Sequence, residues 1–308
     1  GHRASTTVAG ATLAALRPQS GVTPFYRPAS APSGMMEAAR SFHAPLFSGN
    51  AAPVLAARVE EAPADAPQLE LPLGVARAPV RLRPRVAFIS TGGELIDCER
   101  KPSPGQIRNS TAPYLVAALD QLGCQLVARA SVADDPSIFA ARVEEMLEQD
   151  LDLVLATGGL SERRDFVPGA VARLGGETLF DETATRPCQS ALGARFGHGP
   201  LFLGLPGDPM ATVVALRFFA VPLLRWWLGQ PEEQPRAARL LERVEKPAGL
   251  RCFYRGKLEE GPQGLATRCL EDPASTHIQS LLEADAWVVL PEEGDAVERG
   301  AEAAVYPL

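Results

Sequence analysis

The sequence predicts an α/β protein built on a mostly parallel sheet, with a smaller β domain following it in the chain. Three observations indicate this class. Between residues 86 and 228, short apolar runs alternate with segments of helical periodicity, which is the pattern of parallel strands joined by helices. Three of these runs end in a glycine turn, at Thr91–Gly93, Thr157–Gly159 and Leu205–Gly207. After residue 236 the apolar runs shorten and are separated by Gly, Pro and Asp turns, as in a small β-barrel or sandwich.

The first half of the α/β region is expected to contain three strands and two helices. The strands are expected at Val86–Ser90, Gln125–Val132 and Leu151–Thr157. The third is almost continuously apolar, as in a strand covered on both faces. The first helix extends to about Leu122, with Asn109 or Ser110 as its N-cap and Gly123 closing it. The second begins at Pro136, directly after an aspartate pair, and extends to about residue 149.

The second half ends in a long apolar helix. A helix is expected at Pro168–Leu174, a strand at Leu201–Leu205 and the long helix at Pro209–Leu228, which Pro222 should kink or break. The C-terminal strands are expected at Ala238–Val244, Arg251–Leu258, Leu265–Leu270, Ala286–Leu290 and Ala303–Tyr306, with one or two helical turns at Ile278–Glu283. We therefore divide the chain into residues 1–68, 69–235 and 236–308: an atypical linker-like segment, the α/β domain and the small β domain.

Residues 1–68 are rich in Ala, Pro and Ser and show weak periodicity. Val8–Leu16 is apolar and lies between two arginines, so it has features of a signal peptide, but no convincing cleavage site follows and we expect a short helix instead. Met35–Phe42 predicts two helical turns, and Val54–Ala62 is compatible with a helix or a strand.

The composition excludes several classes of function. The net charge of -7 over 308 residues argues against a general nucleic-acid binder, because such binding needs a basic face. Five widely spaced cysteines without a Cys-x-x-Cys pair indicate reduced thiols in a cytoplasmic protein, and the four scattered histidines support neither a zinc site nor a Ser-His-Asp triad. No apolar run approaches the roughly 18 residues of a membrane span, so we expect no membrane anchor.

Each motif taken alone has an alternative interpretation. A strand that ends in a glycine turn presents backbone N–H groups to an anion, but glycine pairs also occur in ordinary turns. Residues 161–165 (SERRD) add a hydroxyl, two guanidinium groups and carboxylates, which suit phosphate binding and equally a solvated loop. Asp208 either lines a site or only caps the next helix. Cys188 is better explained as a small structural residue than as a nucleophile.

The order of the motifs is more specific than any one of them. STGGELI, GQIRNS, a strand followed by DDP, TGGLS followed by DF, an Arg-Pro segment and GLPGDP follow one another between about Leu69 and Leu308. This order resembles the molybdopterin molybdenumtransferase family, which includes MoeA and the gephyrin E domain. The resemblance implies a three-layer α/β/α molybdopterin-binding domain and a β-barrel-like C-terminal domain. It also implies that adenylylated molybdopterin and molybdate are substrates, that Mg2+ assists and that the protein is a dimer.

The resemblance assigns candidate site residues. The ligand-binding positions are Thr91, Gly92, Gly93, Glu94, Asn109, Ser110, Thr157, Gly158, Gly159, Ser161, Arg186, Pro206, Gly207 and Asp208. The catalytic candidates are Asp134, Asp135 and Asp165, and the Mg2+ ligands are Glu94 and Asp165. The sequence departs from the family at Gly93, Gln189 and Ala211, where the family has an acid, a lysine and a serine. These changes remove a carboxylate, a cation and a hydroxyl from the site of metal insertion.

Three functional hypotheses remain at this point. The leading one is molybdenum cofactor biosynthesis, with insertion of molybdate into adenylylated molybdopterin and release of AMP. The departures favour an alternative, a non-catalytic molybdopterin carrier or scaffold. A third is an unrelated nucleotide-binding role on the same fold. For all three we expect a cytoplasmic protein that binds a pterin phosphate or related anion, without nucleic acid or membrane. A homodimer and contacts with cofactor-biosynthesis proteins or a molybdoenzyme are further expectations.

Overall fold

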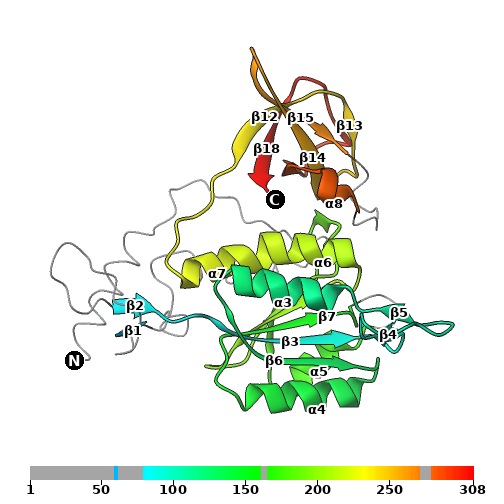
Figure 1. The fold of residues 1–308 in the computed structure, drawn as a ribbon, viewed down its shortest axis with the longest axis vertical. Coiled ribbons are helices and arrows are strands. Elements are labelled where there is room, and N and C mark those ends of the chain that lie inside the picture. The colour runs from blue at the N-terminus through cyan, green and yellow to red at the C-terminus, as the bar shows by residue number, and fades with distance from the viewer. Residues whose placement is uncertain (1–58, 62–78, 161–164, 271–278) are drawn as a thin grey trace.

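The computed structural model describes residues 59–61, 79–160, 165–270 and 279–308. The expected helices at Val8–Leu16 and Met35–Phe42 lie outside the described residues. At the end of the ambiguous Val54–Ala62 segment, β1 (Val59–Glu61) is a strand that pairs antiparallel with β2 (Pro79–Arg81). This short ribbon leads the chain into the central sheet (Figure 1).

A six-stranded mixed sheet with the order β6-β3-β7-β11-β10-β8 forms the middle layer of the larger domain. Its strands are β3 (Arg85–Thr91), β6 (Gln125–Val132), β7 (Leu153–Thr157), β8 (Glu177–Phe180), β10 (Leu192–Arg195) and β11 (Leu201–Leu205). The strands β6, β3, β7 and β11 are parallel and were predicted. The antiparallel ladders of β10 with β11 and β8 were not predicted, since ETLF and LGAR are too short to show a period.

Helices cover both faces of this sheet and make the expected three layers (Figure 1). One face carries α3 (Thr111–Gln121), α6 (Pro209–Ala215) and α7 (Val221–Trp227), and the other carries α4 (Pro136–Leu147) and α5 (Val167–Arg173). Alternate residues of β3 enter opposite cores, Val86 and Phe88 on the α3 side and Ala87 and Ile89 on the α4 side. Burial on both faces explains why the parallel strands are apolar throughout.

The long apolar helix is one continuous run with a π-helical turn in its middle. The π turn η2 (Leu216–Ala220) joins α6 to α7 just before Pro222, which lacks an N–H and whose ring would crowd a regular α turn. Our expectation that no apolar run approaches the length of a membrane span was wrong for Pro209–Trp227. Of its most apolar window, 83% is buried inside the protein, so the length and hydropathy are those of a core helix.

The C-terminal domain is a closed five-stranded β-barrel, one of the two architectures expected. Its strands follow the order β15-β12-β18-β16-β14, and pairing of β14 with β15 closes it. They are β12 (Arg236–Leu240), β14 (Arg251–Gly261), β15 (Gly264–Cys269), β16 (Ala286–Leu290) and β18 (Glu302–Pro307). A small ladder of β13 (Val244–Glu245) with β17 (Ala296–Val297) and the short helix α8 (Gln279–Glu283) complete it.

The barrel is packed directly on the helices of the α/β domain (Figure 1). Phe218 of η2 stacks on Phe253 with ring centroids 4.3 Å apart and meets the rings of Trp287 and Tyr306 edge-on. These aromatic residues belong to the same buried cluster as the core of the sheet. In addition, β9 (Thr185–Arg186) leaves the α/β domain and pairs in parallel with the beginning of β14. One hydrophobic cluster therefore extends from the α3 face of the sheet into the barrel, and the barrel interior has a further cluster of its own.

Candidate functional site

A pocket of about 450 Å³ lies at the carboxyl ends of β3, β7 and β11, where the glycine turns come together. Parallel neighbouring strands place their carboxyl ends at one edge of the sheet, which is where open α/β sheets bind ligands. The lining residues are Thr91, Glu94, Leu95, Ile107, Arg108, Asn109, Ser110, Thr111, Asp134, Thr157, Gly158, Gly159, Leu160, Ser190, Pro206, Gly207, Asp208 and Pro209. Eleven of the predicted ligand, metal or catalytic positions are among them.

The floor of the pocket is main chain, because the turns pack together without side chains between them. Gly158 has a φ of +85°, and a Cβ there would lie 2.6 Å from the carbonyl oxygen of Thr91. A Cβ on Gly207 would lie 3.2 Å from the Cα of Gly158. The Gly158 N–H donates to the carbonyl of Leu205 at 3.3 Å. Only glycine permits this approach, so the turns meet backbone to backbone at the floor of the pocket.

Asp134 is attached to the first glycine turn. Its Oδ1 accepts a hydrogen bond from the Thr91 hydroxyl at 3.0 Å, and its Oδ2 lies 3.5 Å from the donating N–H of Gly93. The Gly92 N–H donates to the carbonyl of Val132 at 3.1 Å. Thr91 and Asp134 line the pocket, whereas Gly92 and Gly93 are not among the lining residues. The carboxylate is thus held at the pocket wall by the residues that begin the motif.

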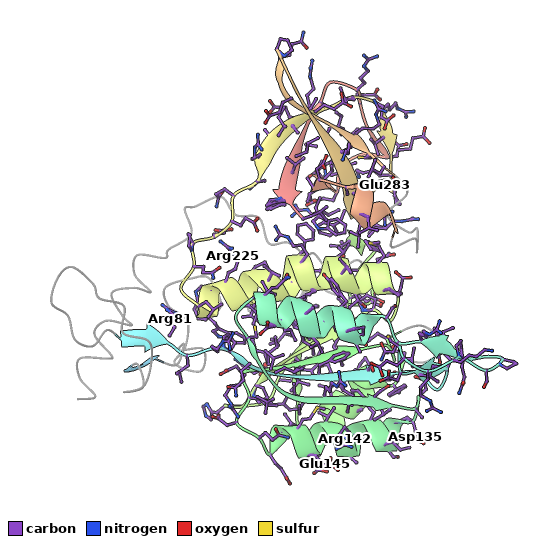
Figure 2. The ribbon with its side chains drawn as sticks, viewed as in Figure 1. Arg81, Asp135, Arg142, Glu145, Arg225 and Glu283 are labelled. Carbon is purple, nitrogen blue, oxygen red and sulfur yellow. The ribbon has the colours of Figure 1, made fainter. Side chains whose placement is uncertain are left out.

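Asp135 has a structural role and does not line the pocket. Its Oδ1 accepts from the backbone N–H groups of Ser137 and Ile138 at 2.8 and 3.0 Å, which makes it the N-cap of α4. Figure 2 shows it at the start of this helix, away from the ion pair of Arg142 with Glu145 further along. Adjacent aspartates of the DDP motif therefore have different tasks.

Removal of the Asp135 cap is expected to lower the free energy of unfolding. Asp135→Ala should reduce the free energy of unfolding by about 1 kcal/mol, because two backbone N–H groups lose their acceptor. Urea denaturation measures the change, and Glu144→Ala, which removes an exposed carboxylate from the same helix, should stay within about 0.5 kcal/mol of the unchanged protein. Equal stability of the two variants would contradict the capping role.

A ribbon of two short parallel strands forms the outer wall of the pocket. It consists of β4 (Leu95–Ile96) and β5 (Ile107–Arg108), which pair with each other shortly before the start of α3. Asn109 anchors the ribbon: its Nδ2 donates to the Ser90 hydroxyl at 2.8 Å and its Oδ1 accepts from the N–H of Ala112 at 3.1 Å. The side chain of Asn109 therefore caps α3, and Ser110 makes no side-chain cap.

The third turn combines capping with a position at the pocket. Asp208 accepts from the backbone N–H of Ala211 at 2.9 Å, caps α6 and also lines the pocket, and its contact with a ligand stays a prediction. The Thr212 hydroxyl donates to the carbonyl of Pro206 at 2.6 Å and so connects α6 to the third glycine turn. Asp208 is held by the fold before any ligand binds.

Two further predicted positions are not among the described residues that line the pocket, and a third, Ser161, lies outside the described residues. Asp165 is exposed, and partial desolvation together with the charges of Asp181 and Glu182 raises the pKa of its carboxyl group. Arg186 belongs to β9 and is paired with the barrel strand β14.

The residues at which the sequence departs from the family that it resembles are not among the lining residues either, although they adjoin some of them. Gln189 is exposed, and Ala211 is buried on α6. The carbonyl of Ala211 accepts from the thiol of Cys188 at 3.3 Å. Complete burial raises the pKa of this thiol well above its usual range, which argues against Cys188 as a nucleophile.

Sequence reasoning missed Arg108, which lies between two matched residues of the GQIRNS motif. It is the only cationic side chain among the lining residues that the structure describes. The same lining includes the carboxylates of Glu94, Asp134 and Asp208. Its position inside the GQIRNS motif was the one sequence feature that could have indicated a place at the site. Ser190, Leu95, Ile107, Thr111, Leu160 and Pro209 also line the pocket and were not predicted.

The donor set suits an anion with an accompanying cation. Backbone amides and a guanidinium group bind phosphate oxygens, and carboxylates bind hard divalent cations. Within the described residues no group of three Asp, Glu, His or Cys side chains is placed to hold a metal ion alone. A cation bound here would therefore share its coordination with oxygen atoms of the ligand or water.

Known families match both domains. The family described as "Probable molybdopterin binding domain" matches residues 87–226, and the "MoeA C-terminal region (domain IV)" matches residues 237–308. The molybdopterin molybdenumtransferase of Synechococcus elongatus is 38% identical over 241 residues, which are 77% of this chain and 58% of that protein. The enzyme of the same name from Bacillus subtilis is 31% identical, over 74% of this chain and 53% of its own length.

A solved structure agrees with the fold. The molybdopterin biosynthesis MoeA protein of Pyrococcus horikosii superposes with a TM-score of 0.64 at 26% identity, over 77% of this chain and 57% of that one. The chain thus spans a little over half the length of the curated relatives that it matches. The comparisons cover both the pocket-bearing domain and the barrel.

Proposed function

The chain belongs to the molybdopterin molybdenumtransferase family, and from this premise we propose that it binds adenylylated molybdopterin and inserts molybdate with release of AMP. The observation that carries the proposal is the pocket at the three glycine turns, which combines main-chain amides with Arg108 and three carboxylates. This is the chemistry that a phosphate-bearing ligand and a divalent cation require. Molybdate and the adenylylated pterin are substrates of the proposed reaction.

The proposed binding mode follows from the floor and walls of the pocket. Backbone amides of the second and third turns bind phosphate oxygens, apart from the Gly158 N–H, which already donates to the carbonyl of Leu205. The hydroxyl of Ser110 adds a donor at the wall. The apolar side chains of Leu95 and Ile107 face the same space and suit the ring system of a pterin. Asp134 holds the first turn in place through Thr91, so the turn is ordered before the ligand arrives.

Mg2+ fits the residues on the pocket wall. Glu94 and Asp134 supply the hard carboxylate oxygens that this ion prefers, and one or two carboxylates with ligand phosphates are its usual protein environment. Bound there, Mg2+ would neutralise charge on the phosphates. Asp165, which is exposed and does not line the pocket, is retained only as a residue that orients water from outside it.

The proposal is tested by native mass spectrometry of the protein with adenylylated molybdopterin, before and after addition of Mg2+ and molybdate. Loss of the mass of AMP with a gain of molybdenum is the expected result. A stable complex that never releases AMP would reject the hypothesis of an enzyme and favour that of a non-catalytic carrier. The carrier is kept as a second candidate because Gly93, Gln189 and Ala211 replace chemically active residues of the family.

Asp134 provides a second test of the proposed cation site. Asp134→Asn keeps the shape of the side chain and removes its charge, so the Mg2+ concentration for half-maximal AMP release is expected to rise about tenfold. The assay is a Mg2+ titration of AMP release at saturating pterin. Asp120→Asn, which changes an exposed carboxylate of α3 outside the pocket lining, is the control. An unchanged Mg2+ requirement would remove Asp134 from the cation site.

We further propose that the protein acts in the cytoplasm as a homodimer and that a cofactor-biosynthesis protein or a molybdoenzyme is its partner. The five cysteines, none in a disulfide, support the reducing compartment. Analytical ultracentrifugation tests the dimer directly. A monomer at micromolar concentration would overturn that part of the proposal.

A further inference from the structure

The pocket wall is acidic, although the proposed ligand is an anion. Glu94, Asp134 and Asp208 line it and carry three formal negative charges. Phosphate oxygens placed among carboxylates are repelled unless a positive charge lies close to them. Of the lining residues that the structure describes, Arg108 alone supplies such a charge from a side chain.

The fold already uses two of the carboxylates. Asp134 accepts from the Thr91 hydroxyl, and Asp208 accepts from the N–H of Ala211. These bonds direct part of each carboxylate toward the protein and away from the ligand. In the described part of the chain, the side chain of Arg108 makes one hydrogen bond, from its Nε to the carbonyl of Arg100 at 3.1 Å. That bond holds the side chain while both terminal nitrogens keep their N–H donors for a ligand.

The backbone around Arg108 is fixed on both sides. The N–H of Ile107 donates to the carbonyl of Glu94 at 2.8 Å, and the N–H of Asn109 donates to the carbonyl of Ile96 at 2.8 Å. The side chain of Asn109 is in turn bound to β3 and α3. Arg108 is thus an exposed cation on an anchored strand, and little backbone ordering is needed when a ligand meets it.

We propose that Arg108 is a ligand-binding residue that holds a phosphate group through its two terminal nitrogens. A guanidinium group matches the spacing of two phosphate oxygens, so the contact selects for phosphate over a neutral pterin. The identity of the ligand as a molybdopterin derivative rests on the proposed function. The role of Arg108 rests on the charge and position of its side chain and requires only a phosphate.

The experiment is isothermal titration calorimetry with adenylylated molybdopterin at two salt concentrations. Arg108→Gln is expected to weaken binding about 10- to 100-fold and to reduce the dependence of affinity on salt. Arg108→Lys should recover part of the loss, since it restores the charge without the planar fork. The matched control is Arg268→Gln, the same exchange at an exposed arginine of the barrel, which should bind as the unchanged protein does.

The outcomes separate this inference from the proposed function. Equal affinities of the unchanged protein and Arg108→Gln, with equal unfolding midpoints, would overturn the role of Arg108 alone. If the unchanged protein does not bind the pterin, the series is repeated with AMP and inorganic pyrophosphate. Binding of either that is lost in Arg108→Gln would support Arg108 while rejecting the proposed substrate. Failure to bind any of the three would overturn both.

Discussion

Gly158→Ala is expected to abolish ligand binding and to destabilise the α/β domain. The Cβ of alanine would lie 2.6 Å from the carbonyl oxygen and 3.0 Å from the hydroxyl of Thr91, at a φ of +85°. Both contacts belong to the neighbouring turn, so one of the two turns must move. We expect the free energy of unfolding to fall by about 2–3 kcal/mol. Displacement of the turn would move its donors away from the phosphate, which should raise the Kd for adenylylated molybdopterin at least about 100-fold.

Substitution of a second glycine, Gly175, distinguishes the steric clash at Gly158 from the cost of its left-handed backbone conformation. Gly175 has a φ of +82°, follows α5 and has no atom within 4 Å of a built Cβ. Gly175→Ala should therefore cost only the left-handed backbone penalty of about 1–2 kcal/mol and leave ligand affinity unchanged. Urea denaturation and calorimetric titration of both variants test this. Equal losses of stability and affinity in the two would show that the contact between the turns has no special role.

Phe218→Ala is expected to weaken the attachment of the barrel to the α/β domain. The Phe218 ring is 2% exposed, stacks on Phe253 and meets Trp287 and Tyr306 edge-on. Truncation of a buried phenylalanine leaves a cavity, so the free energy of unfolding should fall by about 3–5 kcal/mol. Since these rings join two domains, the barrel should separate before the sheet unfolds.

Two probes follow these events. Tryptophan fluorescence reports on Trp287 in the barrel and on Trp226 and Trp227 in α7, and proteolysis between residues 228 and 236 reports on domain separation. Ile138→Ala truncates a side chain on α4 that is 51% exposed and should change stability by less than about 0.5 kcal/mol. If Phe218→Ala unfolded in one step with the stability of this control, the shared core would not hold the domains together.

Local patterns predicted most of the elements that surround the pocket. The run from Val86 to Ser90 is apolar at every position but the last, and both faces of the strand are buried. The start of α4 was readable because aspartate before proline is a local capping signal. The short strands β8 and β10 were missed, since four residues of mixed polarity carry no period and pairing with β11 decides their conformation.

Individual roles at the pocket depended on tertiary contacts. Asp134 and Asp135 are adjacent and chemically identical, yet one reaches Thr91 across the sheet edge and the other caps its own helix. The sequence shows two equal carboxylates, and only the path of β6 beside β3 distinguishes them. Arg186 was expected at the site, but it pairs with Cys252 of the barrel, 66 residues further along the chain.

The amino-acid sequence by itself determined the α/β class, the three strand-end glycine turns and the resemblance to the family, because these depend on short-range pattern and motif order. Tertiary structure alone decided that the turns touch backbone to backbone, that Arg108 stands among carboxylates and that Phe218 joins the barrel to the sheet. Such contacts connect residues distant in the chain. Their geometry follows from the packing of whole strands and helices, which no local run of residues encodes.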